Sequence, residues 1–132
     1  MGRSQGVVFG FGAIIKISDF VAKYPNTFEY DENSKDWSST DELDEIFDSE
    51  GRAESNISEG IKLFYCEMES DIVFIATEHS TVYPFEKGYI WHPFVDIDMD
   101  AIDQEKEIVE TWLYKEFPHS EIGFKMYGYY VG

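Results

Sequence analysis

Runs of apolar and β-branched residues divide the chain into predicted strands. The first run covers residues 7–17, and residues 61–68 and 72–77 flank a short polar connection that is typical of a hairpin. Two further β-rich runs, 81–85 and 89–95, and a final aromatic run, 121–131, complete the predicted strands. Within the first run, Gly10 and Gly12 predict a bulge or a close approach of a neighbouring backbone.

Apolar residues recur at helical spacing in the remaining segments. The longest predicted helix covers residues 101–117 and ends before Pro118. Its apolar stripe consists of Ala101, Ile102, Ile108, Val109, Trp112, Leu113 and Phe117. The capping-box pattern Ser39-x-x-Glu42 predicts a short helix over residues 40–49, and Ser18 predicts another that runs to Lys23. The polar segments 26–38 and 51–60 are predicted to be loops.

This mixture of elements predicts the α+β class. We expect a mainly antiparallel sheet of four to six strands, with two or three helices packed on one face. The length of 132 residues fits a single α+β domain that covers residues 1–132. Hydrophobic residues make up 43% of the chain and aromatic residues 17%, which is enough to build a packed core.

Acidic residues are concentrated in two blocks of the chain. The formal net charge is −17, from 27 acidic and 10 basic side chains. Residues 29–59 hold twelve acids against two bases, and residues 96–110 hold seven acids against one base. These blocks therefore carry net charges of −10 and −6, while the rest of the chain is close to neutral. Such a balance argues against direct binding of nucleic acid or of an anionic membrane, since both require a basic face.

The two acidic blocks predict a surface that attracts a basic partner. An acidic face accelerates the association of basic proteins by electrostatic steering, and such proteins include nucleic-acid-binding proteins and nucleases. On a strand, Asp96, Asp98 and Asp100 would lie roughly 6–7 Å apart, in an arrangement that resembles a row of phosphates. Trp37 is expected to be exposed, because it lies in a polar segment of the first block. The predicted partner-binding residues are Asp36, Trp37, Asp41, Glu42, Asp44, Glu45, Asp48, Asp96, Asp98, Asp100 and Asp103.

We therefore expect a small acidic, non-enzymatic binding or inhibitor protein that engages a basic protein surface. The most specific version of this hypothesis is a DNA mimic of the phage or mobile-element anti-defence type. An immunity protein that neutralises a toxin or nuclease is the first alternative. A small enzyme, or a calcium-binding module that uses the acidic cluster between Asp96 and Glu107, is the second.

The calcium alternative depends on spacing within the second acidic block. Asp96, Asp98, Asp100 and Glu107 match positions 1, 3, 5 and 12 of an EF-hand loop. Position 6, where glycine allows a sharp turn, is Ala101, and the preceding residues are predicted to form a strand instead of the entering helix. The spacing therefore favours a strand end that leads into a capped helix.

Other residue types give no constellation that defines a reaction. His79, His92 and His119 are dispersed, with no pair at metal-ligand spacing on a predicted helix. The single cysteine, Cys66, excludes an intramolecular disulfide and fits a reducing cytoplasm. No apolar stretch approaches the roughly 20 residues of a membrane helix. We accordingly expect no catalytic residues, no bound metal, no cofactor and a cytoplasmic location.

Overall fold

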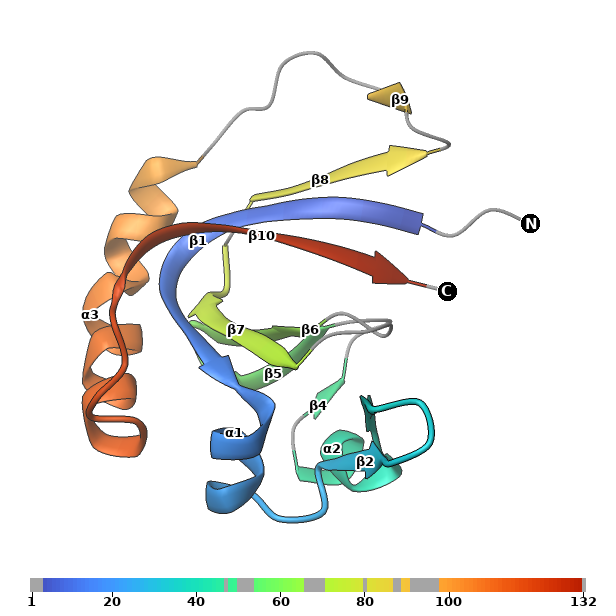
Figure 1. Cartoon of the computed structure of the whole chain (residues 1–132). Coiled ribbons are helices and arrows are strands. Elements are labelled where there is room, and N and C mark those ends of the chain that lie inside the picture. The colour runs from blue at the N-terminus through green and yellow to red at the C-terminus, as the bar shows by residue number, and fades with distance from the viewer. Residues whose placement is uncertain are drawn as a thin grey trace.

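The computed structural model shows strands and helices mixed along the chain (Figure 1). It describes residues 4–46, 48–49, 54–65, 71–79, 81–86, 89–90 and 98–131, and it describes side chains for residues 8–43, 57–65, 71–79 and 98–126. The elements are β1 (Ser4–Lys16), α1 (Ile17–Lys23), β2 (Phe28–Asp31), β3 (Asp36–Ser39), α2 (Asp41–Ile46), β4 (Asp48–Ser49), β5 (Glu54–Ser58), β6 (Ile61–Tyr65), β7 (Ile72–Thr77), β8 (Thr81–Glu86), β9 (Tyr89–Ile90), α3 (Met99–Glu116) and β10 (Gly123–Val131).

The long strand β1 organises the main sheet. Its residues 12–16 pair with β7 and its residues 5–9 pair with β8, while β10 pairs with residues 4–12. Because Gly12 has partners in both β7 and β10, these two strands lie on opposite edges of β1. In the described part of the chain the sheet has eight strands, in the order β4-β5-β6-β7-β1-β8-β9 with β10 paired to β1, and every pairing is antiparallel.

Beta1 bends in its middle, at the point where its pairing passes from β8 to β7 (Figure 1). Gly12 lies at this point, and a Cβ placed on it would be 1.9 Å from the backbone oxygen of Ile75. The close backbone approach that the sequence predicts is therefore confirmed at Gly12. No larger residue fits there unless β7 moves away from β1.

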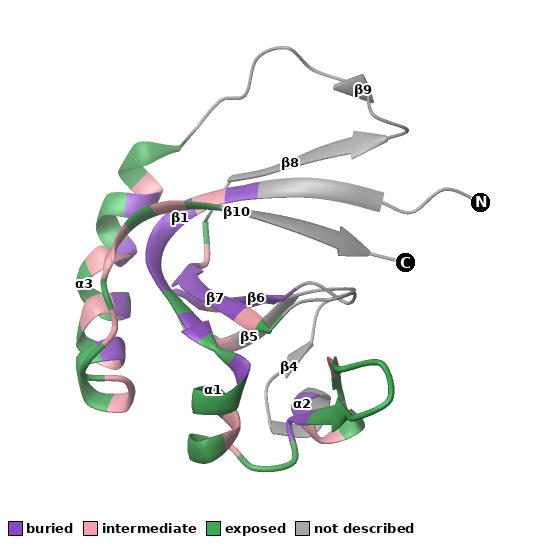
Figure 2. Ribbon diagram, viewed as in Figure 1, coloured by how far each residue is buried: buried purple, intermediate pink, exposed green. Residues whose placement is uncertain are grey.

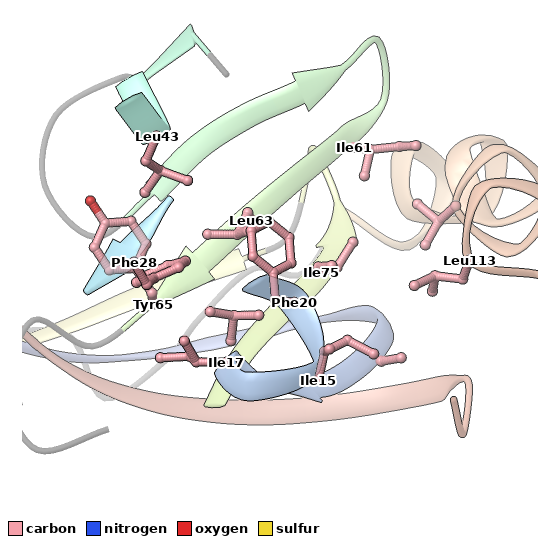
Figure 3. Packing of buried hydrophobic residues seen from close by; sticks show 13 residues of the cluster. Ile15, Ile17, Phe20, Phe28, Leu43, Ile61, Leu63, Tyr65, Ile75 and Leu113 are labelled. Atoms are coloured by element: carbon pink, nitrogen blue, oxygen red, sulfur yellow. The ribbon is translucent and has the colours of Figure 1, made fainter. Parts of the chain in front are cut away.

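The principal core fills the face of the sheet that the helices cover (Figure 3). Phe20 of α1, Leu43 of α2 and Leu113 of α3 meet side chains from the sheet in one buried cluster. The sheet residues of that cluster are Ala13, Ile15, Ile61, Leu63, Tyr65, Val73 and Ile75. A second, smaller cluster joins Val8, Phe64, Phe74 and Ala76. Since adjacent strand residues such as Phe74 and Ile75 point to opposite faces, the smaller cluster lies on the other face of the sheet.

The α+β class is confirmed, with an antiparallel sheet and helices on one face. Six of the eight described strands of the main sheet have five or more residues, and the two-residue strands β4 and β9 extend the sheet. The predicted strand 72–77 is β7, and the predicted helix 101–117 is α3 with its start two residues earlier. None of the described helices combines the length and apolar composition needed to cross a membrane.

Two predicted loops are wrong. The segment 26–38 contains β2 and most of β3, which form a separate two-stranded sheet. The segment 51–60 contains β5, which pairs with both β4 and β6. Most residues of the segment 26–38 are exposed, and β5 lies one strand from the edge of the main sheet, so polarity alone concealed the strands.

Candidate partner-binding surface

The first acidic block is organised around the β2–β3 hairpin. Its four-residue loop, 32–35, is closed by a hydrogen bond of 2.7 Å from the Lys35 N–H to the carbonyl oxygen of Asp31. The Asp31 carboxylate also accepts a hydrogen bond of 2.9 Å from the N–H of Asn33. Lys35 has a positive φ of 59°, which turns the chain back into β3. The loop thus fixes the register in which the two strands pair.

One face of the hairpin is aromatic and packs toward the core. Phe28 is 5% exposed and belongs to the principal core cluster. Tyr30 and Trp37 are opposite each other in the ladder, with ring centroids 5.1 Å apart. Trp37 is half-buried and packs against the core, so the expectation that it is exposed is wrong: the strand pairing turns its ring inward. Tyr30, at 46% exposure, is the aromatic side chain that this face offers to solvent.

The other face of the hairpin is acidic. Asp31 and Asp36 are directly opposite each other, and Glu29 lies two residues before Asp31 on the same face. Glu29 and Asp31 are exposed, and Asp36 is half-buried. Directly opposed residues have Cβ atoms about 4.5–5.5 Å apart, a distance at which like charges repel. Three carboxylates therefore share a small, preformed surface.

Helix α2 continues the acidic region beyond the hairpin. It begins at Asp41. Ser39 is the last residue of β3, so it is not the residue next to the helix start that the predicted capping box requires. Thr40 precedes the helix, and its hydroxyl donates a hydrogen bond to the carbonyl oxygen of Asn26. Asp41 is exposed, and Glu42 is half-buried, with one carboxylate oxygen enclosed and without a hydrogen-bond partner among the described groups. Asp44 and Glu45 also lie in α2 and Asp48 in β4, but their side chains are outside the described residues.

The second acidic block lies at the start of α3. Asp98 is the N-cap residue, and its carboxylate accepts a hydrogen bond of 3.1 Å from the N–H of Ala101. Asp100 and Asp103 are exposed on the first turns, and Asp96 is outside the described residues. The predicted strand-like alternation is wrong for Asp98 and Asp100, since the helix begins between them. The acids here instead complement the positive end of the helix dipole.

The same helix excludes an EF-hand loop. From Met99 onward the chain is continuously helical to Glu116. At about 1.5 Å of rise per residue, Asp98 and Glu107 are separated by roughly 13 Å along the axis. They cannot ligate one ion, so the calcium loop suggested by the spacing of these residues is not formed.

The predicted binding residues of the two acidic blocks do not meet in the part of the chain that the structure describes. Figure 1 places the start of α3 at one end of the molecule and the β2–β3 hairpin with α2 at the opposite end. Figure 2 shows β2 and the hairpin loop as an exposed region separate from the exposed side of α3. The predicted binding residues thus divide into a hairpin set, with Asp36, Trp37, Asp41 and Glu42, and a helix set, with Asp98, Asp100 and Asp103.

A third cluster of polar side chains was missed by the sequence analysis. Glu105 is 7% exposed and accepts hydrogen bonds from His79: one of 2.9 Å from the backbone N–H and one of 2.5 Å from Nδ1. The hydrogen bond to Glu105 and the charge of that carboxylate raise the pKa of His79. The sequence contains a signal for this buried acid, because Glu105 is a charged residue on the apolar stripe of the helix. It lies three residues after Ile102 and four before Val109.

Together, the fold and this surface define an α+β protein in which an acidic hairpin packs against the core through its aromatic face. No family model, no curated protein and no solved structure matches the chain.

Proposed function

We propose that this protein is a small acidic, non-enzymatic binding or inhibitor protein whose β2–β3 hairpin engages a basic surface of another protein. The observation that carries the proposal is the register of the hairpin, which sets Asp31 directly opposite Asp36 with Glu29 on the same face. Solubility requires charge, but it does not require carboxylates at directly opposed positions of one ladder.

The energetics of this face favour a cationic partner. Opposed carboxylates repel each other in the free protein, and a bound arginine or lysine would replace that repulsion with attraction. Natural proteins tolerate local conflicts of this kind mainly at functional sites. Exposed Tyr30, on the aromatic face of the same hairpin, adds a ring on which a guanidinium group can stack at the hairpin edge.

The class of partner follows from the pattern of charge. Glu29 and Asp31 are two positions apart on a strand, which corresponds to roughly 6–7 Å. A rigid row of anions at such spacing competes with a nucleic-acid backbone for arginine and lysine side chains. We therefore propose that the partner is a nucleic-acid-binding protein and that the hairpin binds its basic groove. If the protein is an immunity protein, the partner is a nuclease toxin. The encounter takes place in the cytoplasm in this proposal, where Cys66 stays reduced.

Titration against a panel of DNA-binding proteins and nucleases tests the proposal. Each panel member is bound to labelled duplex DNA, and the acidic protein is added at about 0.05 M and about 0.5 M NaCl. We expect displacement of DNA from at least one member, with the effect much weaker at the higher salt concentration. Absence of displacement across the panel, or displacement that is indifferent to salt, would contradict the proposal.

A further inference from the structure

The buried carboxylate of Glu105 is the starting point for a second site. It lies on the core-facing side of α3 with Ile102, Val109 and Leu113. A carboxylate in such a position is costly unless its oxygens are bonded. Both oxygens have partners, since Oε1 accepts from the His79 N–H at 2.9 Å and Oε2 lies 2.5 Å from His79 Nδ1. The carboxylate is therefore held in one orientation, toward the end of β7.

The turn that carries Glu78 and His79 is hydrogen-bonded to the turn between β5 and β6. The N–H of Glu78 donates a hydrogen bond of 2.9 Å to the carbonyl oxygen of Gly60. Gly60 has a φ of +84°, and a Cβ on it would be 3.3 Å from Ile108 and 3.7 Å from Glu105. The turn at Gly60 therefore lies close to α3 and is joined to the turn that carries Glu78 and His79. As a result, one ligand atom from each of Glu78, His79 and Glu105 lies within 4.8 Å of the others.

We propose that Glu78, His79 and Glu105 bind a divalent transition-metal ion, for which Zn²⁺ is the appropriate probe. One imidazole nitrogen and two carboxylate oxygens are a ligand set that suits Zn²⁺ better than Ca²⁺. At zinc–ligand distances of about 2.0–2.2 Å, tetrahedral ligand atoms are roughly 3.4 Å apart. Ligation requires the side chains of the exposed His79 and the half-buried Glu78 to rotate until the three atoms reach that spacing.

Metal binding would displace the proton between His79 Nδ1 and Glu105 Oε2, and this proton would be released to the solvent. The metal takes the imidazole nitrogen and one oxygen, Glu78 supplies the third ligand, and water completes the tetrahedron. The backbone N–H of His79 keeps its bond to Glu105 Oε1 and orients the ligating carboxylate. Two carboxylates lie beside the one imidazole, so the charge of the cluster favours a cation. The site shares no residue with the acidic hairpin and is independent of the proposed function.

Calorimetric titration of the full chain with Zn²⁺ tests this site. The buffer contains about 0.15 M NaCl, which screens the surface carboxylates, and millimolar Mg²⁺, which competes for weak cation binding to them. We expect one Zn²⁺ per chain, with affinity weakened roughly tenfold or more by either His79→Gln or Glu78→Gln. Glu78 is half-buried and His79 is exposed, so these variants test ligation without removing a buried side chain.

Matched controls distinguish this site from general attraction of cations. His119→Gln removes the other described histidine, and Glu107→Gln removes an exposed carboxylate of α3; we expect each to change affinity by less than about twofold. The His79 ring resonances should also shift on addition of Zn²⁺. Equal weakening by all four substitutions, or no stoichiometric binding by the unsubstituted chain, would overturn the proposal.

Discussion

Asp31 and Asp36 face each other across the β2–β3 ladder, so the hairpin carries two carboxylates at directly opposed positions. Hairpins are generally stabilised by favourable cross-strand pairs at such positions, and here the pair is repulsive. The other face of the same hairpin pairs Tyr30 with Trp37 and buries Phe28. The aromatic face therefore supports a strand pairing that the acidic face opposes.

Removal of one of these charges should stabilise the protein. We expect Asp36→Thr to raise the free energy of unfolding by about 0.2–1 kcal/mol, because it removes the repulsion and introduces a good strand former. Asp31 is unsuitable for this test, since its carboxylate accepts the hydrogen bond from Asn33 in the loop. Urea denaturation at low salt measures the gain, which should shrink as salt screens the charges.

The control for this prediction is Asp103→Asn on α3. It changes the net charge by the same amount, but Asp103 lies 3.7 Å from Lys106 and has Glu107 four residues later on the same helix, so attraction and repulsion are of similar size. We expect little change or a slight loss of stability. Equal stabilisation by both substitutions would assign the effect to the total charge of the chain and not to the hairpin register.

Gly12 and Gly123 are partners in the β1–β10 ladder, yet they should respond differently to alanine. A Cβ at Gly12 would be 1.9 Å from the backbone oxygen of Ile75, whereas a Cβ at Gly123 has nothing within 4 Å. Gly12→Ala should therefore lower the free energy of unfolding by about 3 kcal/mol or more, since backbone must move. Gly123→Ala should be neutral or stabilise by up to about 1 kcal/mol. Equal effects in denaturant unfolding would contradict the close approach at Gly12.

Tyr30 and Trp37 should contribute differently to the stability of the protein. Trp37 is half-buried against the core, so Trp37→Ala should cost about 1.5–3 kcal/mol in thermal or urea unfolding. Tyr30 is 46% exposed, and Tyr30→Ala should cost less than about 1 kcal/mol. If the larger loss followed the tyrosine substitution, the inward orientation of Trp37 would be wrong.

The His79–Glu105 contact should make stability depend on pH. The hydrogen bond to Glu105, and then its charge, raise the folded-state pKa of His79 above its ordinary value of about 6.5. The contribution of this contact to the free energy of unfolding is therefore complete below about pH 6.5, and it is lost as pH rises through the raised pKa of His79. Because His79 is largely exposed, the expected size is below about 1 kcal/mol.

This pH dependence is measured as a difference from His79→Gln, in buffer that contains a metal chelator. The difference in unfolding free energy should be larger at about pH 6 than at about pH 9, since both proteins share the other acidic groups. A difference that is constant over this range, or that grows at high pH, would contradict the direction of the pKa shift.

Much of the sheet and the long helix was predictable from apolar pattern. Beta7 is buried along most of its length, so its continuous apolar run marks it clearly. The β2–β3 hairpin was not predictable in this way, because Phe28 is the one buried residue of its two strands. Its strand pairing depends on the loop at Asn33 and Lys35 and on an aromatic pair, which the residue pattern does not distinguish from a polar loop.

The candidate surface was predictable in composition but not in arrangement. Charge counting finds the two acidic blocks, but it does not show that the β2–β3 hairpin and the start of α3 lie at opposite ends of the molecule (Figure 1). Nor does it show that Asp98 caps a helix instead of continuing a strand. The Glu78, His79 and Glu105 cluster depends on contact between a turn and a helix 26 residues apart in sequence, which spacing along the chain does not reveal.

The most direct test of the proposed function compares two sets of three neutral substitutions. One set, Glu29→Gln with Asp31→Asn and Asp36→Asn, neutralises the acidic face of the hairpin and keeps an acceptor at position 31. The other, Asp100→Asn with Asp103→Asn and Glu107→Gln, makes the same charge change on α3. Binding is measured with the panel member that the unsubstituted protein displaces most strongly from DNA. We predict that the hairpin set weakens binding by roughly tenfold or more and the α3 set by less than about threefold; equal weakening by both sets, or a larger effect from α3, would contradict the account.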